Sequence, residues 1–367
     1  MGSPAIKKIL IVNIFGIGDV LFTTPLLSNI KKNIPDAFIG YVVNARAVSV
    51  LQNNPHIDHL YIYDRDEYQA MYQKSKGLFV KRGKEFLSLL KKEKYDLLID
   101  LSLNSWVGFW AWALGIPHRA GFDYKQRGRF LTQRVKFAGY EDRHVVEYYL
   151  SLLSELGFNV TPQTLSLPIT KEDERWADLF LSKQGLTADE MKIGLVPGGG
   201  ASWGADAPYK RWPAQKYAEL ADKIIENLKT PIILLGDEKE IKLCEEIAGI
   251  MKHKAILACG RTSVTQCGAL FKQCTLAVVN DGGPLHIAVA SGLKTVSIFG
   301  PVDENVYGPY PRADHEVVTS EIACRPCYRQ FRRASCQHIS CLHHITVDAV
   351  YQKVKAKLEK TKEFSFN

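Results

Sequence analysis

The sequence lacks the long apolar stretches of membrane-spanning helices and of signal peptides. Its longest apolar stretch, residues 106–116, has about half of the roughly 20 residues that cross a bilayer. Residues 9–14 are also apolar, but they are too few for the core of a signal peptide. We therefore expect a cytoplasmic protein.

The composition also lacks any bias towards disorder, low complexity or an extreme of charge. Hydrophobic residues make up 46% and charged residues 23% of the 367 residues, which is typical of globular proteins and sufficient for two domains. The net charge of +8 at pH 7 favours an anionic ligand or surface. The charge alone does not choose between nucleic acid, anionic lipid and a phosphorylated sugar.

Disulfides are not the first expectation for the eight cysteines, because a cytoplasmic protein keeps its thiols reduced. Four of them form the compact series Cys324-x2-Cys327-x8-Cys336-x4-Cys341. Four thiolates in such a series can hold a structural zinc, although the spacing departs from the two close pairs of zinc ribbons. Thiols that only shape a loop are an equal alternative, and a disulfide is the third.

Short apolar segments alternate with amphipathic ones in both halves of the sequence. This alternation predicts parallel sheets with right-handed helical crossovers. The expected strands are residues 8–14, 37–43, 59–63 and 96–101 in the first half, and 192–196, 231–235, 255–258, 276–280 and 295–299 in the second. Residues 157–170 are the expected linker.

The expected fold class is therefore α/β, with two Rossmann-like domains whose parallel sheets face a central cleft. Residues 1–165 are assigned to the first domain and residues 166–367 to the second, and the C-terminal helix is allowed to pack back on the first domain. Open parallel sheets bind ligands beyond the carboxyl ends of their strands, so the loops that follow the strands should carry the site.

The loop after the first expected strand is Phe15-Gly-Ile-Gly-Asp-Val-Leu21, which lacks the third glycine of a dinucleotide-binding fingerprint. The second strand also lacks the acidic residue of such a site, so a dehydrogenase is disfavoured. Asp19 begins the next helix, where an aspartate can act as an N-cap. Its alternative role is a general base at the cleft, and the residues alone do not decide between the two.

A glycine-rich loop in the second half has the composition of a phosphate site. Gly198 and Gly199 let the backbone approach a phosphate closely, and Lys210 supplies a positive charge nearby. A glycine-rich surface loop is the alternative.

A second anion site is predicted in the segment Asn280-Asp-Gly-Gly-Pro-Leu-His286, which joins a buried strand to a helix. The amides of Gly282, Gly283 and the first helical turn should point to one place, where the helix dipole also favours an anion. His286 can donate a hydrogen bond to a phosphate oxygen. A tight turn with a histidine on the helix surface is the alternative.

Acidic residues follow two further strands. Glu238 or Glu240 can accept hydrogen bonds from ribose hydroxyls, or can complement the dipole of the next helix. The pair Asp64-x-Asp66 matches a metal-binding motif known from nucleotide-sugar enzymes of a different architecture, but it lies among charged loop residues and is expected to be a solvated turn.

Two helices of the first half stand out by composition. Residues 74–94 contain eight basic and two acidic side chains, which are either merely solvated or face an anionic, lipid-linked acceptor. The helix with Trp106, Trp110 and Trp112 is expected to belong to the core, and a contact with lipid is the alternative.

Taken together, these segments resemble glycosyltransferase family 9, the ADP-heptose:lipopolysaccharide heptosyltransferases, over nearly the whole chain. The resemblance rests on Gly16-x-Gly-Asp-Val-Leu-x-Thr-x-Pro25, Lys210-Arg-Trp-Pro213, Asp281-Gly-Gly-Pro-Leu-His286-x-Ala288 and Phe299-Gly-Pro301. It implies the GT-B fold. It also implies an inverting, metal-independent transfer of a sugar, heptose by the family name, from an ADP-sugar donor to a lipopolysaccharide core or another lipid-linked saccharide.

The resemblance also implies roles for individual residues. Asp19 would be the catalytic base and Lys210 would bind the donor diphosphate. The pyrophosphate would meet Asp281, Gly282, Gly283 and His286, and the ribose would meet Glu238 or Glu240. Members of the family often carry Thr or Ser where this chain has Gly282, so a hydroxyl donor would be lost and only the amide kept.

The resemblance further implies a monomer that needs no catalytic cofactor and acts at the cytoplasmic face of the inner membrane, without nucleic acid. A nucleotide-sugar epimerase, or a transferase of another sugar on the same fold, is one alternative. A zinc-containing nucleotide- or nucleic-acid-binding module is another, disfavoured because aromatic and basic residues are not interleaved as in such modules.

Overall fold

The computed structural model describes residues 6–200, 203–336 and 338–364, and the chain divides into two compact units. The first unit comprises Met1–Gly139 and Val145–Gln163, and the second comprises Tyr140–His144 and Thr164–Asn367. The division after Gln163 lies inside the expected linker, whereas the short segment Tyr140–His144 joins the second unit although it precedes that linker.

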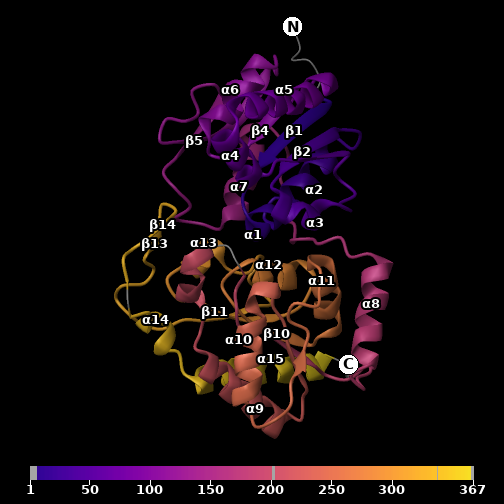
Figure 1. The fold of residues 1–367 in the computed structure, drawn as a ribbon, viewed down its shortest axis with the longest axis vertical. Helices are drawn as coiled ribbons and strands as arrows, with labels where there is room; N and C mark the ends of the chain where they lie inside the picture. Colours follow the sequence, from indigo (N-terminus) through magenta and orange to yellow (C-terminus); the bar gives the residue numbers. More distant parts are fainter. Residues whose placement is uncertain (1–5, 201–202, 337, 365–367) are drawn as a thin grey trace. The chain divides into compact units, whose positions relative to one another are not determined.

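The first unit is built on a six-stranded parallel sheet with the strand order β3-β2-β1-β4-β5-β6 (Figure 1). The strands are β1 (Lys8–Asn13), β2 (Phe38–Val43), β3 (His59–Ile62), β4 (Leu97–Asp100), β5 (His118–Tyr124) and β6 (Gln133–Phe137). Central strands are apolar because both faces of the sheet are covered. The strands β5 and β6 contain charged residues and were not expected from the sequence, and β6 lies at the edge of the sheet.

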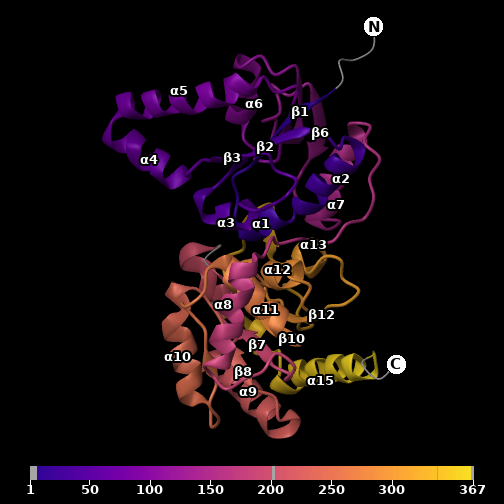
Figure 2. The same ribbon diagram turned by 90° about the vertical axis from the view of Figure 1, so that its right-hand side faces the viewer.

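Helices cover both faces of this sheet. They are α1 (Ile17–Leu21), α2 (Thr24–Asn33), η1 (Ala45–Ala47), α3 (Val48–Leu51), α4 (Arg65–Lys74), α5 (Lys76–Glu93), α6 (Ser105–Ala113) and α7 (Val145–Glu155). Side chains of α5 and α6 share one apolar cluster with β1 and β4, so these two helices cover the same face. Figure 2 shows α2 and α7 together on the other side of the sheet.

The sequence predicts one helix from about Asp19 to Lys32, and this prediction is wrong because the chain forms α1 and α2 instead. Pro25 has no N–H with which to continue the helical ladder from the Leu21 carbonyl. The Thr24 hydroxyl donates to that carbonyl at 2.8 Å and satisfies it. The break leaves α1 as a short turn of helix that carries Asp19.

The second unit has its own six-stranded parallel sheet, with the order β12-β11-β10-β7-β8-β9. The strands are β7 (Ile193–Val196), β8 (Ile232–Leu234), β9 (Ile256–Leu257), β10 (Leu276–Asn280), β11 (Thr295–Ile298) and β12 (Glu316–Val318). A separate antiparallel hairpin pairs β13 (Tyr328–Arg329) with β14 (Arg332–Arg333).

The helices of this unit lie on both faces of its sheet. They are α8 (Lys171–Ser182), η2 (Gly204–Lys210), α9 (Ala214–Leu228), η3 (Glu238–Glu240), α10 (Ile241–Ile250), α11 (Val264–Gln273), α12 (Gly283–Ala290), α13 (Glu304–Tyr307), α14 (Ser340–His343) and α15 (Val347–Phe364). The C-terminal helix α15 buries Val350, Val354 and Leu358 in the core of the second unit. The sequence left open that this helix packs back on the first domain, and these three side chains pack within the second unit.

Candidate functional site

Three loops of the second unit are tied together by one buried side chain. Asn280 ends β10, which is the hydrogen-bonded neighbour of β7, and it is 0% exposed. Its Nδ2 donates to the carbonyl of Pro197 in the loop after β7 at 2.6 Å. Its Oδ1 accepts the Trp212 amide at 3.2 Å, which fixes the segment that follows Lys210. Sequence analysis gave Asn280 no role, because its two partners are distant in the chain.

Two of these loops touch through glycines. A Cβ atom on Gly282 would lie 1.9 Å from the Gly199 carbonyl oxygen, and the φ of Gly282 is +153°. Gly199 and Gly200 both have a φ of 77°, a left-handed conformation that glycine adopts without strain. The loop of Gly198–Gly200 therefore occupies the space that a Thr or Ser side chain at residue 282 would need.

Lys210 and Asp281 form an ion pair at the same place. The Lys210 Nζ lies 2.7 Å from the Asp281 Oδ2, and both side chains are almost fully enclosed. The ammonium also lies 4.3 Å from the ring centroid of Trp203, within the range of a cation–π interaction. The structure thus brings together the lysine and the aspartate that the sequence placed at a diphosphate.

The N-terminus of α12 follows the Asp281 position. Pro284 has no N–H, and the Leu285 amide already donates to the Gly282 carbonyl at 3.1 Å. Of the amides expected to bind an anion, only those of Gly282 and Gly283 therefore stay available. Their place at the start of the helix retains the favourable dipole for an anion.

His286 is buried within the unit rather than exposed on the helix surface, with 4% exposure. Burial holds its pKa well below the ordinary value, and His144 and Lys210 lower the pKa further. The imidazole is therefore neutral at pH 7 and can offer one ring N–H, but no positive charge.

His144 was missed by sequence analysis. It comes from the Tyr140–His144 segment and is buried in the second unit, where its Nε2 lies 3.0 Å from the Gly308 carbonyl oxygen. Its ring stacks on Tyr310 at a centroid distance of 4.8 Å. Burial lowers its pKa to about 4, so it too is neutral. No local pattern signals such a residue, because it depends on contacts with a distant part of the chain.

The two glutamates proposed for the ribose occupy different environments. Glu240 is 2% exposed, and its carboxylate accepts the amides of Gly200 at 2.9 Å and Asp237 at 3.0 Å. Burial raises its pKa, and the Arg211 guanidinium lies 3.6 Å away. Glu240 thereby stabilises the glycine-rich loop through its hydrogen bond with Gly200. Glu238 is exposed at the beginning of η3.

Asp19 lies in the first unit, at the third position of α1. Its Oδ2 accepts the Gly16 amide at 3.3 Å, and the carboxylate is half-buried. Asn13 at the end of β1 donates to the Asp19 carbonyl at 3.1 Å and accepts the Phe15 amide at 3.1 Å. The N-cap residue of α1 is Gly16, so Asp19 stabilises the turn from inside the helix.

Asp100 is a second acid in the first unit that sequence analysis missed. It ends β4 beside Val12 of β1, and it is 5% exposed. Its Oδ1 accepts the Ser102 amide at 2.9 Å and the Ser102 hydroxyl at 2.6 Å. Burial raises its pKa to about 6. The signal in the sequence is an acidic residue that ends an otherwise apolar strand.

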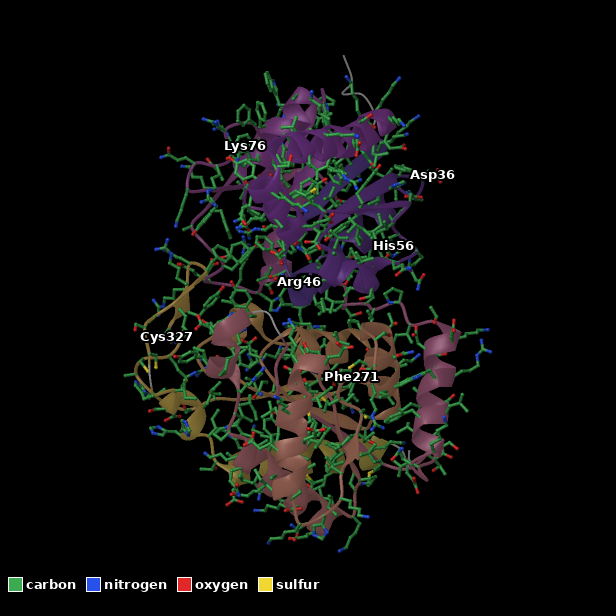
Figure 3. The ribbon with its side chains drawn as sticks, in the orientation of Figure 1. Asp36, Arg46, His56, Lys76, Phe271 and Cys327 are labelled. Atoms are coloured by element: carbon green, nitrogen blue, oxygen red, sulfur yellow. The ribbon has the colours of Figure 1, made fainter. Side chains whose placement is uncertain are left out.

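The four clustered cysteines line one small cavity in the second unit, next to the β13–β14 hairpin (Cys327 in Figure 3). Burial and the neighbouring thiols raise the pKa of Cys327 and raise that of Cys341 to about 11. Within the residues that the structure describes, no group of three or more His, Cys, Asp or Glu is placed to hold a metal ion. The structural zinc therefore stays a prediction.

Asp64 and Asp66 lie at the start of α4, where Asp66 forms an ion pair with Arg46 of η1. Asp64 is the N-cap of α4 and accepts the amides of Asp66 and Glu67 at 2.9 and 3.0 Å. This is the arrangement of a helix start on the surface, in keeping with a solvated turn.

Comparison with known proteins identifies the family. The family model described as glycosyltransferase family 9 (heptosyltransferase) matches residues 85–338. Lipopolysaccharide heptosyltransferase 3 of Escherichia coli K12 is 25% identical over 299 residues, covering 80% of this chain and 82% of that protein. Lipooligosaccharide heptosyltransferase 2 of Campylobacter jejuni serotype O:2 is 24% identical over 350 residues, covering 94% and 96%.

Solved structures give the same fold. A glycosyl transferase of family 9 from Veillonella parvula matches with a TM-score of 0.78 and 25% identity, covering 96% of this chain and 97% of that one. The E. coli ADP-heptose lps heptosyltransferase II matches with a TM-score of 0.74 and 21% identity, covering 97% and 99%. Of the helices that the structure describes, none has the length and apolar character needed to cross a bilayer.

Proposed function

The chain belongs to glycosyltransferase family 9 and has the GT-B fold, and on this basis we propose that it transfers heptose from ADP-heptose to a lipopolysaccharide-core or other lipid-linked saccharide. The observation that carries the proposal is the Lys210–Asp281 pair beside the amides of Gly282 and Gly283. This arrangement offers fixed positive charge and backbone donors at the carboxyl ends of two adjacent strands, where an open sheet binds nucleotides.

The proposed reaction is a single displacement at the anomeric carbon. A bond forms from the acceptor hydroxyl oxygen as the bond to the diphosphate oxygen breaks, and ADP leaves with the electron pair. Negative charge grows on the diphosphate, and Lys210 with the two amides would stabilise it without a divalent cation. Neutral His286 would add one N–H donor.

Asp19 is proposed to accept the proton of the attacking hydroxyl. Its half-buried carboxylate is reachable by solvent, and the hydrogen bond from Gly16 fixes its orientation. A base that takes this proton makes the oxygen a better nucleophile as the new bond forms. Attack from the side opposite the leaving group would invert the anomeric configuration.

For the ribose we propose Glu238 rather than Glu240. The carboxylate of Glu240 is already engaged by two amides inside the unit, whereas Glu238 is exposed after β8. The backbone of Gly198 and Gly199 is proposed to lie close to the donor diphosphate. The absence of a side chain at Gly198 makes room for Glu240, because a Cβ atom there would lie 1.8 Å from the Glu240 Oε1.

The cysteine cluster is proposed to shape the loop around the β13–β14 hairpin, without a part in the chemistry. The raised thiol pKa values of Cys327 and Cys341 fit protonated side chains in a partly buried cavity. Metal analysis of the purified protein tests this. About one zinc per chain would establish the predicted metal site instead.

The experiment that tests the donor site is a thermal-shift comparison of ADP, UDP and GDP, each with and without EDTA. A ligand that binds only the folded state raises the melting temperature. We expect selective stabilisation by ADP that EDTA leaves unchanged, followed by transfer from ADP-heptose. Stabilisation by UDP or GDP would mean that the donor carries that nucleotide instead of ADP. Stabilisation by none of the three would contradict the proposed donor site. Donor turnover without an acceptor would favour an epimerase.

A further inference from the structure

Exposed apolar side chains are concentrated in the first unit. Nine large hydrophobic residues are exposed among those the structure describes, and only Leu179 and Ile250 belong to the second unit. The other seven are Ile62, Tyr72, Leu78, Val80, Leu89, Trp106 and Trp112. Single exposed apolar residues need no explanation, but a group on one unit marks an interaction surface.

Two of the seven, Trp106 and Trp112, belong to an aromatic patch that also contains Phe109 and Phe130. Trp106 is 61% and Trp112 56% exposed, so the expectation that these tryptophans belong to the core is wrong. The ring of Phe109 lies 6.1 Å from Trp106, 5.9 Å from Trp112 and 5.2 Å from Phe130, as centroid distances. Helix α6 packs Val107, Ala111 and Leu114 on the sheet, which leaves the tryptophans outside.

The aromatic patch has a basic rim. The Arg129 guanidinium lies over the ring of Phe130, 4.8 Å from its centroid. Lys125 and Arg127 are exposed in the same loop, and Arg127 Nη1 donates to the Leu103 carbonyl just before α6 at 3.3 Å. Residues 101–139 contain six Lys and Arg side chains and a single acidic one.

That one acidic side chain does not neutralise the rim. It belongs to Asp123, whose carboxylate accepts the Gly128 amide at 2.8 Å. Asp123 offsets one of the six basic charges of residues 101–139. The net positive charge per residue is therefore higher in this segment than in the whole chain, whose formal net charge is +8.

Helix α5 adds to this surface from the side. It covers the same face of the sheet as α6, and the two helices lie side by side in both views (Figures 1 and 2). Residues 74–94 carry eight basic and two acidic side chains, and Lys76 at the start of α5 points outward (Figure 3). Leu78, Val80 and Leu89 are exposed on the same helix.

We propose that the aromatic patch and its basic rim dock the first unit on an anionic lipid bilayer. Tryptophan favours the boundary between lipid headgroups and acyl chains, since its ring is apolar and its N–H is polar. Lysine and arginine near a membrane surface are attracted by anionic headgroups. The two features together are typical of proteins that lie on a bilayer without crossing it. The inference deepens the proposed function, because a lipid-linked acceptor would be reached at such a surface.

Flotation of the full chain with lipid vesicles tests the proposal. We expect binding to vesicles of phosphatidylglycerol and phosphatidylcholine, weak binding to phosphatidylcholine alone, and weaker binding as salt increases. The double substitution Trp106→Ser/Trp112→Ser should lower the affinity about tenfold or more, since two half-exposed rings no longer enter the interface. Lys125→Glu/Arg129→Glu should lower it at least about tenfold, since each basic residue is worth roughly fivefold.

Matched substitutions in the second unit serve as controls. Leu179 is 63% exposed, and Lys183 is exposed on the same unit, so Leu179→Ser and Lys183→Glu should leave vesicle binding unchanged. Every variant should keep the stabilisation by ADP, which shows that the fold and the donor site survive. Equal binding by the wild type and the aromatic-patch variants would overturn the proposal.

The failure of the docking surface and the failure of the proposed function give different results. A protein that ignores both vesicles, yet transfers sugar to a detergent-dispersed acceptor, would retain the function and lose the docking surface. A protein that binds anionic vesicles through the aromatic patch, yet uses no ADP-sugar, would retain the surface and lose the function. Binding of single-stranded RNA that disappears in the same variants, without vesicle binding, would assign the surface to nucleic acid and overturn the proposal.

Discussion

Both units end a central strand with a fully buried asparagine, but the two asparagines organise very different loops. Asn13 bonds to Phe15 and Asp19, which are two and six residues away. Asn280 bonds to Pro197 and Trp212, which are 83 and 68 residues away. The first unit therefore has a locally built turn, whereas the second has a site assembled from distant segments and fixed before any ligand binds.

The buried acid that ends β4 in the first unit differs from the two buried acids at the candidate site of the second unit. In the second unit Asp281 is paired with Lys210, and Glu240 lies near Arg211 while it accepts two amides. In the first unit the Asp100 carboxylate accepts two hydrogen bonds from the neutral Ser102. A preorganised charge site is what stabilisation of a leaving diphosphate needs. Asp19 of the first unit is a half-buried acid on the short helix α1, which suits a proton acceptor instead.

Asp19→Ala is expected to distinguish most clearly between the roles of the two units, because it should affect catalysis but not the binding of ADP. Loss of a general base should lower kcat about 100- to 10,000-fold. The donor site of the second unit is untouched, so the rise in melting temperature with ADP should persist. Steady-state kinetics and a thermal-shift assay measure the two effects.

Asp19→Asn is the control for a purely structural role. The asparagine side chain can still accept the Gly16 amide, but it cannot take a proton. Activity as low as that of Asp19→Ala supports the base, whereas near wild-type activity would reduce Asp19 to a stabiliser of the turn.

Lys210→Ala tests the proposed donor site of the second unit. We expect kcat/KM to fall about 100-fold, since a fixed donor to the departing diphosphate is lost. Binding of ADP should also weaken. The Asp281 carboxylate would remain buried without its cation, which should lower the free energy of unfolding by about 3 kcal/mol.

The double variant Lys210→Ala/Asp281→Asn separates these two effects. Removal of the buried charge should restore part of the lost stability, while ADP binding stays weak. Wild-type affinity for ADP in the single variant would remove Lys210 from the donor site.

Gly282→Ser tests whether the contact between the two glycine loops matters. The serine Cβ would meet the Gly199 carbonyl oxygen, so the loops must separate. We expect the free energy of unfolding to fall by about 2 kcal/mol and the Kd for ADP to rise about tenfold. Denaturant unfolding and calorimetry measure the two changes.

Gly249 in α10 provides the matched control, because a Cβ there meets no atom within 4 Å. Gly249→Ala should stabilise the protein by about 1 kcal/mol, as alanine favours a helix over glycine. If Gly282→Ser is as stable as the wild type and binds ADP more tightly, the glycine loop moves aside easily and the added hydroxyl acts as a phosphate donor.

The sequence predicted the parts of this fold that depend on local patterns. The central strands β1, β4, β7 and β10 are short apolar runs, and each was expected within one or two residues of its observed bounds. The strands β5, β6 and β12 were missed because each contains charged residues rather than one continuous apolar run. Position in the sheet is not the reason, because β5 is an inner strand and the edge strands β3 and β9 were expected.

The candidate site shows the same limit. Glycine loops and a helix start are local signals, so the sequence could propose Lys210, Asp281 and His286 as site residues. The structure places these three near one another, and their role at the donor stays a prediction. The contributions of His144 and Asn280 depend on contacts across the unit, which no spacing along the chain reveals. The exposure of Trp106 was also unpredictable, because an all-apolar helix gives no indication of which side faces the sheet.

The effect of Asp100→Asn on stability is expected to depend on pH, and this dependence sharpens the contrast between the buried acids. Burial raises the pKa of Asp100 to about 6, above the roughly 3.9 of an unfolded chain. Below about pH 4 both states hold the proton, so the buried carboxyl costs nothing. Between about pH 4 and pH 6 the unfolded chain loses the proton first, so the stability of the wild type falls as the pH rises.

Above about pH 6 the cost stays constant, at roughly 3 kcal/mol as an upper bound. Asparagine avoids this cost and keeps an oxygen that accepts from Ser102, so the variant should gain stability at about pH 8 and almost none at about pH 4. Asp281→Asn should do the reverse at about pH 8, because it leaves the Lys210 ammonium enclosed without its partner. Thermal unfolding at both pH values decides the matter: if Asp100→Asn destabilises the protein at high pH, the Asp100 carboxylate has a charged partner in solution and the two units hold their buried acids in the same way.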